Sequence, residues 1–210
     1  MRLRQSGMPE EFYWESLFDV NGLLDRLGID AGLGDVVELG CGYGTFSLPV
    51  ARRITGVLRT FDIDGSMVAR TRARATEEGV LNLACELRDA FEQGFGVLAG
   101  SQDACLLFNI LHCEEPERLL REAFRVLRPG GRLFVVHWRH DPATPRGPSL
   151  DVRPRPEQCA AWAATAGFQQ CPPGVFDLPP FHFGMVFRAR SEPRLRTPHR
   201  AGQCGPELRF

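Results

Sequence analysis

The chain lacks lysine: its 25 basic residues are all arginine, and with 26 acidic residues the formal net charge is −1. A charge this close to zero gives no electrostatic footprint for a nucleic-acid partner, although local arginine patches remain compatible with it. No apolar run approaches a membrane span in length, and no signal-peptide apolar segment follows the N-terminal residues 1–7. We therefore expect a cytoplasmic protein that binds neither nucleic acid nor membrane.

Paired cysteines are also lacking. The seven cysteines are an odd number and include no Cys-x-x-Cys pair. In a chain of 210 residues this count and spacing argue against a disulfide scaffold and against zinc. Because most of them lie in apolar runs, we expect reduced core cysteines and no metal.

The length and the 43% hydrophobic content are ordinary for one globular domain. We expect this domain over residues 1–190, with N-terminal helices or a lid at 1–34. Repeated prolines predict a disordered tail at 191–210.

A glycine-rich turn follows the first predicted strand, which begins at Val36. Gly40, Gly42 and Gly44 end the strand before a helix, and such a turn brings bare backbone N–H groups close to a ligand. The spacing Gly-x-Gly-x-Gly differs from the Gly-x-Gly-x-x-Gly of dinucleotide sites, and Glu38 would repel a pyrophosphate. The pattern favours a cationic ligand over NAD, with a ligand-free turn as the plainer alternative.

Two further acids end the next two predicted strands, at 56–63 and 81–89. Asp62 lies where α/β nucleotide binders place a carboxylate against a ribose diol. Asp89 is placed to accept from an exocyclic amine, with Phe91 against a purine face, or simply to cap a turn. Because ligands bind outside the carboxyl ends of parallel strands, we expect these two acids and Glu38 to converge on one crevice.

The other elements follow from hydrophobic periodicity. Asp64 is expected to cap a helix over 66–78, whose Arg70, Arg72 and Arg74 we expect to be largely solvated. Further elements are predicted at 103–112 (strand), 118–128 (helix), 131–138 (strand), 156–167 (helix), and 168–178 and 181–189 (a closing pair of strands).

Residues 10–28 predict two short helices with a break near Asn21 and Gly22. The adjacent Tyr13 and Trp14 point to different faces, so that one can pack while the other covers a ligand pocket. Core packing is the expectation for Trp14, whereas the phenol of Tyr13 suits a wet or paired position equally well.

These motifs resemble the class I S-adenosylmethionine (SAM)-dependent methyltransferases. Their first motif is an acid followed by Gly-x-Gly-x-Gly, as in Glu-Leu-Gly-Cys-Gly-Tyr-Gly here, and the string Arg-Val-Leu-Arg-Pro-Gly-Gly-Arg-Leu closely resembles another of their turns. The resemblance covers residues 36–138 and implies a small, bacterial-type, single-domain member. It implies an α/β fold: a three-layer sandwich with a mainly parallel seven-stranded sheet, helices on both faces and a C-terminal antiparallel hairpin.

The resemblance also implies the cofactor, S-adenosyl-L-methionine, with S-adenosyl-L-homocysteine (SAH) as product. Glu38 would serve the methionine moiety, Asp62 the ribose hydroxyls and Asp89 the adenine amino group, while Asn109 falls in the motif that borders the sulfonium. The expected cofactor-binding residues are Glu38, Gly40, Cys41, Gly42, Gly44, Asp62, Ile63, Met67, Asp89, Ala90, Phe91 and Asn109.

The substrate side is expected in a proline-stiffened loop over 139–156, whose arginines and histidines suit a small anionic acceptor. A surface loop with solvated arginines is an equally weighted alternative. Histidine, with an ordinary pKa near ~6.5, suits proton uptake during methyl transfer, although buried histidines often only satisfy a backbone group. The candidates for acid–base work are His112, His137, His182 and Tyr13. The expected substrate-binding residues are Tyr13, Trp14, His112, Arg139, Arg146 and His182.

The sequence therefore predicts methyl transfer from SAM to a small-molecule acceptor by in-line displacement, driven mainly by positioning. Two alternatives stay open: a module that binds SAM or SAH without turnover and, less favoured, an NAD-type oxidoreductase. Arsenite methylation would need a thiolate cluster, which the cysteine spacing does not supply.

Overall fold

The computed structural model describes residues 8–141 and 143–190, so residues 1–7, position 142 of the substrate-side loop and the tail expected at 191–210 lie outside it. A mixed sheet forms the middle layer, in the order β3-β2-β1-β4-β5-β8-β6, with β7 also paired to β8. The strands are β1 (Val36–Leu39), β2 (Leu58–Asp62), β3 (Leu83–Leu87), β4 (Gln102–Phe108), β5 (Leu127–Trp138), β6 (Phe168–Gln170), β7 (Phe176–Leu178) and β8 (His182–Ala189). The first five run parallel, and β8 lies antiparallel to β5.

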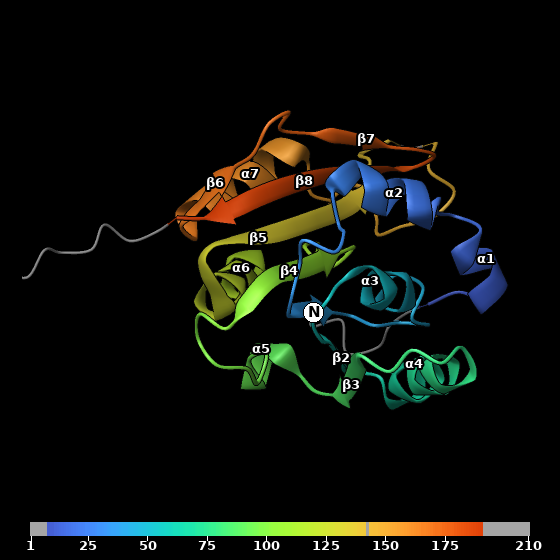
Figure 1. Ribbon diagram of the computed structural model, residues 1–210. Helices are drawn as coiled ribbons and strands as arrows, with labels where there is room; N and C mark the ends of the chain where they lie inside the picture. Colours follow the sequence, from blue (N-terminus) through green and yellow to red (C-terminus); the bar gives the residue numbers. More distant parts are fainter. Residues whose placement is uncertain (1–7, 142, 191–210) are drawn as a thin grey trace, which may run out of the picture.

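Helices cover both faces of this sheet (Figure 1). The helices are α1 (Glu11–Glu15), α2 (Val20–Leu27), α3 (Ser47–Arg53), α4 (Gly65–Glu77), α5 (Ala90–Gln93), α6 (Pro116–Val126) and α7 (Pro156–Thr165). Alternate strand residues point to opposite faces. Val37 and Leu107 pack with α6 and α7 in one core, and Val36 and Leu106 pack with α2 and α3 in the other. The predicted three-layer α/β sandwich is thereby confirmed.

The C-terminal antiparallel strands are also confirmed, but the sheet has eight strands instead of seven. β6 and β7 lie end to end along the edge of β8 that faces away from β5. Pro172 and Pro173 lie between them, and proline has no N–H for the hydrogen-bond ladder. The strand expected over 168–178 is therefore two short strands.

Two element boundaries differ from the prediction. β5 begins at Leu127, which pairs with Gln102 ahead of a register shift, so the preceding helix ends at Val126. The N-terminal break lies before Asp19 and not at Asn21-Gly22. The Asp19 side chain accepts a hydrogen bond from the Gly22 N–H at 3.0 Å, which caps α2 and keeps Gly22 inside that helix.

The five parallel strands have their carboxyl ends at one edge of the molecule, toward the right of the view in Figure 1. Helix α1 and the segment between β5 and α7 lie at the same edge. In an open parallel sheet this is the edge at which ligands bind. None of the helices within residues 8–141 and 143–190 has the length and apolarity needed to cross a bilayer.

Candidate active site

A cavity of about 600 Å³ opens at the carboxyl ends of the parallel strands. Its walls come from the ends of β1 to β5, and two segments from outside the sheet complete it. One is N-terminal, with Met8, Pro9 and Trp14, and the other contributes residues between 146 and 152. Asp62 and Asp89 line this cavity, as the convergence argument predicts, but Glu38 does not.

The glycine turn divides into a part that lines the cavity and a part that packs. Gly40, Cys41 and Gly42 line the cavity, whereas Gly44 does not. Gly44 has φ +80°, and a Cβ atom there would lie 2.5 Å from Leu48 Cδ1. We therefore assign Gly44 to the close packing of α3 against the turn, which corrects its expected place at the ligand.

Asp62 ties the first turn to the second. Its Oδ2 accepts from the Gly42 N–H and its Oδ1 from the Asp64 N–H, both at 3.0 Å. A carboxylate has about four lone-pair sites, so these two bonds leave capacity toward the cavity. Asp64 accepts from the Ser66 N–H at 2.9 Å and is the predicted N-cap of α4.

Asp89 caps a turn, as one of the two alternatives from the sequence predicts, and it also lines the cavity. Its Oδ1 accepts from the N–H groups of Phe91 at 3.0 Å and Glu92 at 3.3 Å, which caps the short helix α5. The same carboxylate lines the cavity together with Ala90, Phe91 and, on the neighbouring strand end, Ile63. The cap therefore fixes the orientation of an acid that faces the cavity.

Glu38 lies beneath the turn, with 2% of its surface exposed. It accepts from the Ser47 hydroxyl at 2.5 Å. Burial raises the pKa of Glu38 to about 7, against the opposing effect of the hydrogen bond from Ser47. Glu38 therefore supports the turn from behind, and its expected contact with a ligand amino group stays a prediction. Met67 is likewise outside the lining, packed with Cys41 and other buried residues.

Asn109 stands at the end of β4 with φ 55°, the one non-glycine positive φ among the described residues. Both polar atoms of its side-chain amide are buried without a hydrogen-bond partner in the described part of the chain, and it lines the cavity. The Thr45 hydroxyl, which also lines the cavity, is in the same condition. Buried polar atoms without partners are rare in folded proteins, so we interpret both as groups that pair with a ligand.

The three candidate histidines occupy different environments. His112 lines the cavity, and its Nδ1 lies 3.3 Å from Nε2 of the fully buried His137. Burial lowers the pKa of His112, with help from the charge of Arg153, and lowers that of His137 well below its ordinary value. His137 therefore reaches the cavity only through His112.

His182 belongs to the core. Its ring stacks on Phe18 with centroids 4.5 Å apart and lies 4.2 Å from Trp138, and only 1% of the residue is exposed. Burial lowers the pKa of His182 to about 3. It is not among the cavity residues, so this position gives its expected catalytic and substrate roles no support.

The N-terminal aromatic pair is arranged in the opposite sense to the expectation. Trp14 lines the cavity, in edge contact with Phe18 and Trp138, at 4.8 and 6.3 Å. Tyr13 is 40% exposed and lies outside the lining. Trp14 therefore lies at the cavity, as its expected substrate role requires, and not in the core, while the substrate contact expected for Tyr13 gains no support from this position.

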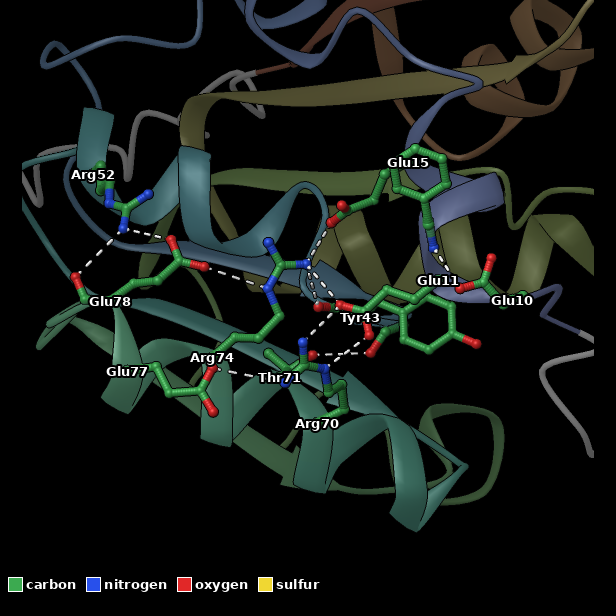
Figure 2. Close-up of polar contacts among 12 residues, drawn as sticks. Glu10, Glu11, Glu15, Tyr43, Arg52, Arg70, Thr71, Arg74, Glu77 and Glu78 are labelled. Atoms are coloured by element: carbon green, nitrogen blue, oxygen red, sulfur yellow. Dashed lines mark hydrogen bonds and ion pairs between the residues drawn. The ribbon is translucent and has the colours of Figure 1, made fainter.

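Helix α1 has no buried residue and is held by ion pairs to α4 (Figure 2). We call Glu11, Glu15, Arg70 and Arg74 the α1–α4 cluster. Arg70 Nε donates to Glu11 at 2.8 Å, and Arg74 Nη1 donates to Glu15 at 2.5 Å and to the Tyr43 carbonyl at 3.1 Å. The cluster joins the N-terminal cover of the cavity to the glycine turn.

The predicted solvated face of α4 is confirmed for Arg72, which is exposed, and for Arg70, which is 40% exposed at its side chain, but Arg74 is only 17% exposed. These side chains also make specific contacts: Arg72 donates to the Cys85 carbonyl at 2.9 Å. Periodicity alone does not show this, because their partners lie on α1 and β3 and are distant in sequence.

The loop arginines also differ from the prediction. Arg153 is 6% exposed and donates to the carbonyls of Pro148 at 2.7 Å and Arg139 at 2.8 Å, so it holds the loop together from inside. Arg139 pairs with Asp177 and donates to the His182 carbonyl, which directs it to β7 and β8. Arg146 does line the cavity, but the expected substrate role of Arg139 is corrected.

The comparisons with known proteins agree with this arrangement. Residues 36–131 match the methyltransferase domain family. The chain is 35% identical, over 62% of its length, to a probable S-adenosylmethionine-dependent methyltransferase from Mycolicibacterium smegmatis. It is 28% identical to the ubiquinone biosynthesis O-methyltransferase of Pseudomonas aeruginosa, with 76% of each chain covered.

The extent of these matches differs. The chain spans about half the length of curated relatives above 30% identity: 47% of the M. smegmatis protein and 46% of an uncharacterised protein from Streptomyces fradiae. A crystal structure of a SAM-dependent methyltransferase from Aquifex aeolicus superposes with a TM-score of 0.74 at 20% identity. That superposition covers 86% of this chain and 94% of the other, and it shows a common fold.

Proposed function

We propose that this chain is a class I SAM-dependent methyltransferase, because residues 36–131 match the methyltransferase domain family and a probable SAM-dependent methyltransferase is 35% identical to it. It would transfer the methyl group of SAM to a small-molecule acceptor held in the same cavity. The observation that carries the proposal is the pair of unpartnered polar groups, Asn109 and Thr45, in a cavity that Asp62 and His112 also line. When bound, SAM supplies an electrophilic methyl group on a sulfonium.

The residues on the β1 to β3 side suit the cofactor. Asp62 would accept from the ribose hydroxyls, and Asp89 with Phe91 would hold the adenine edge and face. The turn from Gly40 to Gly42 would face the methionine moiety with bare backbone. Asn109 would supply its free amide groups near the reacting end, which removes the cost of leaving them unpaired.

His112 is the candidate base. If its Nδ1–H donates to Nε2 of His137, then Nε2 of His112 is left as an acceptor toward the cavity. Its lowered pKa keeps the ring neutral at pH 7, which is the form that can take a proton. Positioning of donor and acceptor would supply most of the rate, and His112 would contribute the smaller share.

A small acceptor is favoured because the cavity is covered. Trp14 approaches from α1, and Arg146 and Val152 approach from the loop after β5. A module that binds SAM without turnover would have no use for a neutral histidine at this point, and so the His112–His137 pair favours catalysis. The glycine spacing continues to disfavour NAD chemistry.

The test is release of SAH from SAM across a panel of small phenols, amines and carboxylates. We expect turnover of at least one class, a fall of roughly 10²-fold or more in kcat for His112→Ala, and unchanged SAH affinity in that variant. His140→Ala, in the loop after β5, is the matched histidine control. Tight SAH binding with no turnover of any acceptor would favour the binding module.

A further inference from the structure

Basic side chains contribute little to the part of the cavity at the ends of β4 and β5. Arg139 and Arg153 are engaged within the protein, and His137 is buried behind His112. On this side the cavity is lined by two basic residues, Arg146 and His112. The acceptor-side chemistry is therefore not set by the cluster of positive charge that the loop sequence predicts.

Aromatic rings form this side instead. Trp14, Phe46, Phe108 and Trp138 all line the cavity, and we call them the aromatic wall. They come from α1, from the residue before α3, and from the ends of β4 and β5. The strand order places the ends of β4 and β5 on the opposite side of β1 from Asp62 and Asp89, where the cofactor residues lie.

The rings of the wall hold one another in place. Phe46 meets Phe108 edge-on with centroids 5.2 Å apart at 81°, and Trp14 meets Trp138 at 6.3 Å and 63°. Phe18 bridges the two pairs, 5.0 Å from Phe46 and 4.8 Å from Trp14. The wall is thus built before a ligand arrives, and little ordering of side chains opposes binding.

Such a wall distinguishes planar from saturated ligands. Ring faces carry partial negative charge and ring edges partial positive charge, so an aromatic ligand gains edge-to-face or offset contacts that a saturated ring of equal size does not. Phe46, Phe108 and Trp138 have 7%, 6% and 2% of their surface exposed, so each ring packs mainly within the protein and borders the cavity with a small part of its surface.

We propose that the acceptor is a planar aromatic molecule whose ring lies against the aromatic wall and whose nucleophilic oxygen or nitrogen lies toward His112. This deepens the proposed function and rests on it. In the transfer, the bond from the nucleophile to the methyl carbon forms as the carbon–sulfur bond breaks. The sulfur retains that bond's electron pair, and the proton of the nucleophile passes to His112.

The test uses the full chain, first titrated with SAH and then, at SAH saturation, with matched ligands. The probes are 2-naphthol, its saturated analogue decahydro-2-naphthol, and hexanoate as an aliphatic anion. Trp14 and Trp138 in the wall give a fluorescence readout, and calorimetry gives affinities. We expect 2-naphthol to bind about tenfold more tightly than its saturated analogue, the ratio that corresponds to about 1.4 kcal/mol.

Trp14→Leu should remove most of this preference, because it keeps an apolar side chain but removes a ring of the wall. Helix α1 has no buried residue, so this change leaves the folding core intact. Trp162→Leu, on α7 and outside the cavity lining, is the matched control and should keep the preference.

Each contrary outcome has one meaning. Equal binding of the two ring compounds, tighter binding of hexanoate, or no binding of any of the three at millimolar concentration overturns the aromatic assignment while leaving SAH binding as evidence for the proposed function. Failure to bind SAH in the first titration refutes the proposed function itself, and the acceptor assignment falls with it.

Discussion

Glu38 gives a quantitative test of how the glycine turn is supported. Its pKa is raised from 4.5 to about 7 by burial beneath the turn. Because the folded state binds this proton more tightly than the unfolded state, stability from Glu38 is fully present below about pH 4.5 and is lost as pH rises through about 7. A difference of one in pKa corresponds to about 1.4 kcal/mol, so the loss amounts to about 3 kcal/mol.

The perturbation is Glu38→Gln, which keeps an acceptor for Ser47 but cannot ionise. We expect the variant to gain about 3 kcal/mol relative to the native chain between about pH 5 and pH 8, measured as the difference in free energy of unfolding by urea at each pH. The buried histidines titrate alike in both proteins, so their contribution to the pH dependence of stability cancels in this difference.

Glu78→Gln is the control. Burial raises the Glu78 pKa, but ion pairs with Arg52 and Arg74 outweigh this effect, so the pKa lies below its ordinary value of 4.5. The difference between this variant and the native chain should stay flat over the same range. If the stability difference for Glu38→Gln does not change with pH, burial does not raise the pKa of Glu38. This carboxyl would then be ionised throughout the range, or solvent would reach it.

Three further outcomes follow from the geometry. Gly44→Ala should lower the free energy of unfolding by roughly 2 kcal/mol more than Gly28→Ala, measured by urea unfolding, because both have positive φ but only Gly44 has atoms within 4 Å of the added Cβ. Equal losses would show that backbone strain alone matters. Arg153→Met should speed proteolysis of the loop after β5 while leaving SAH affinity within about twofold, since it leaves several buried carbonyls without their donor. An unchanged cleavage rate would contradict its role as the loop's internal support. For a reaction that uses His112 as base, kcat should rise with pH along a curve whose midpoint lies below 6.5, the ordinary histidine pKa, because burial lowers the pKa of His112. A midpoint above pH 6.5 would exclude this histidine as the titrating group.

The sequence correctly predicts which strand-end residues lie at one cavity, although their contacts with a ligand stay predictions. Asp62, Asp89 and Asn109 each follow a parallel strand, and topology alone brings such positions to one edge. The first motif predicts the turn, but period-two reasoning does not separate a side chain above the turn from one beneath it. Glu38 is beneath because its side chain reaches Ser47 at the start of α3.

The substrate side is predicted less well because its contacts are long-range. A cluster of arginines in the sequence suggests a positive surface. In the structure, however, Arg153 donates hydrogen bonds to carbonyls of its own loop, and Arg139 forms an ion pair with Asp177. The aromatic wall is assembled from segments far apart in the chain, so no local pattern identifies Phe46 or Phe108 as cavity residues. The sequence does contain a signal for one cavity residue that the prediction missed, Thr45, because this residue directly follows the last glycine of the motif.

Calorimetric titration of SAH into the native chain, Asp62→Asn and Asp64→Asn tests whether the cavity binds the cofactor through Asp62. Both acids sit on the same turn, but Asp62 lines the cavity and Asp64 caps α4. We expect the native chain to bind SAH with micromolar affinity. Asp62→Asn should lower this affinity roughly tenfold or more, and Asp64→Asn should change it within about twofold. Undetectable SAH binding to the native chain, or equal losses in the two variants, would contradict this expectation.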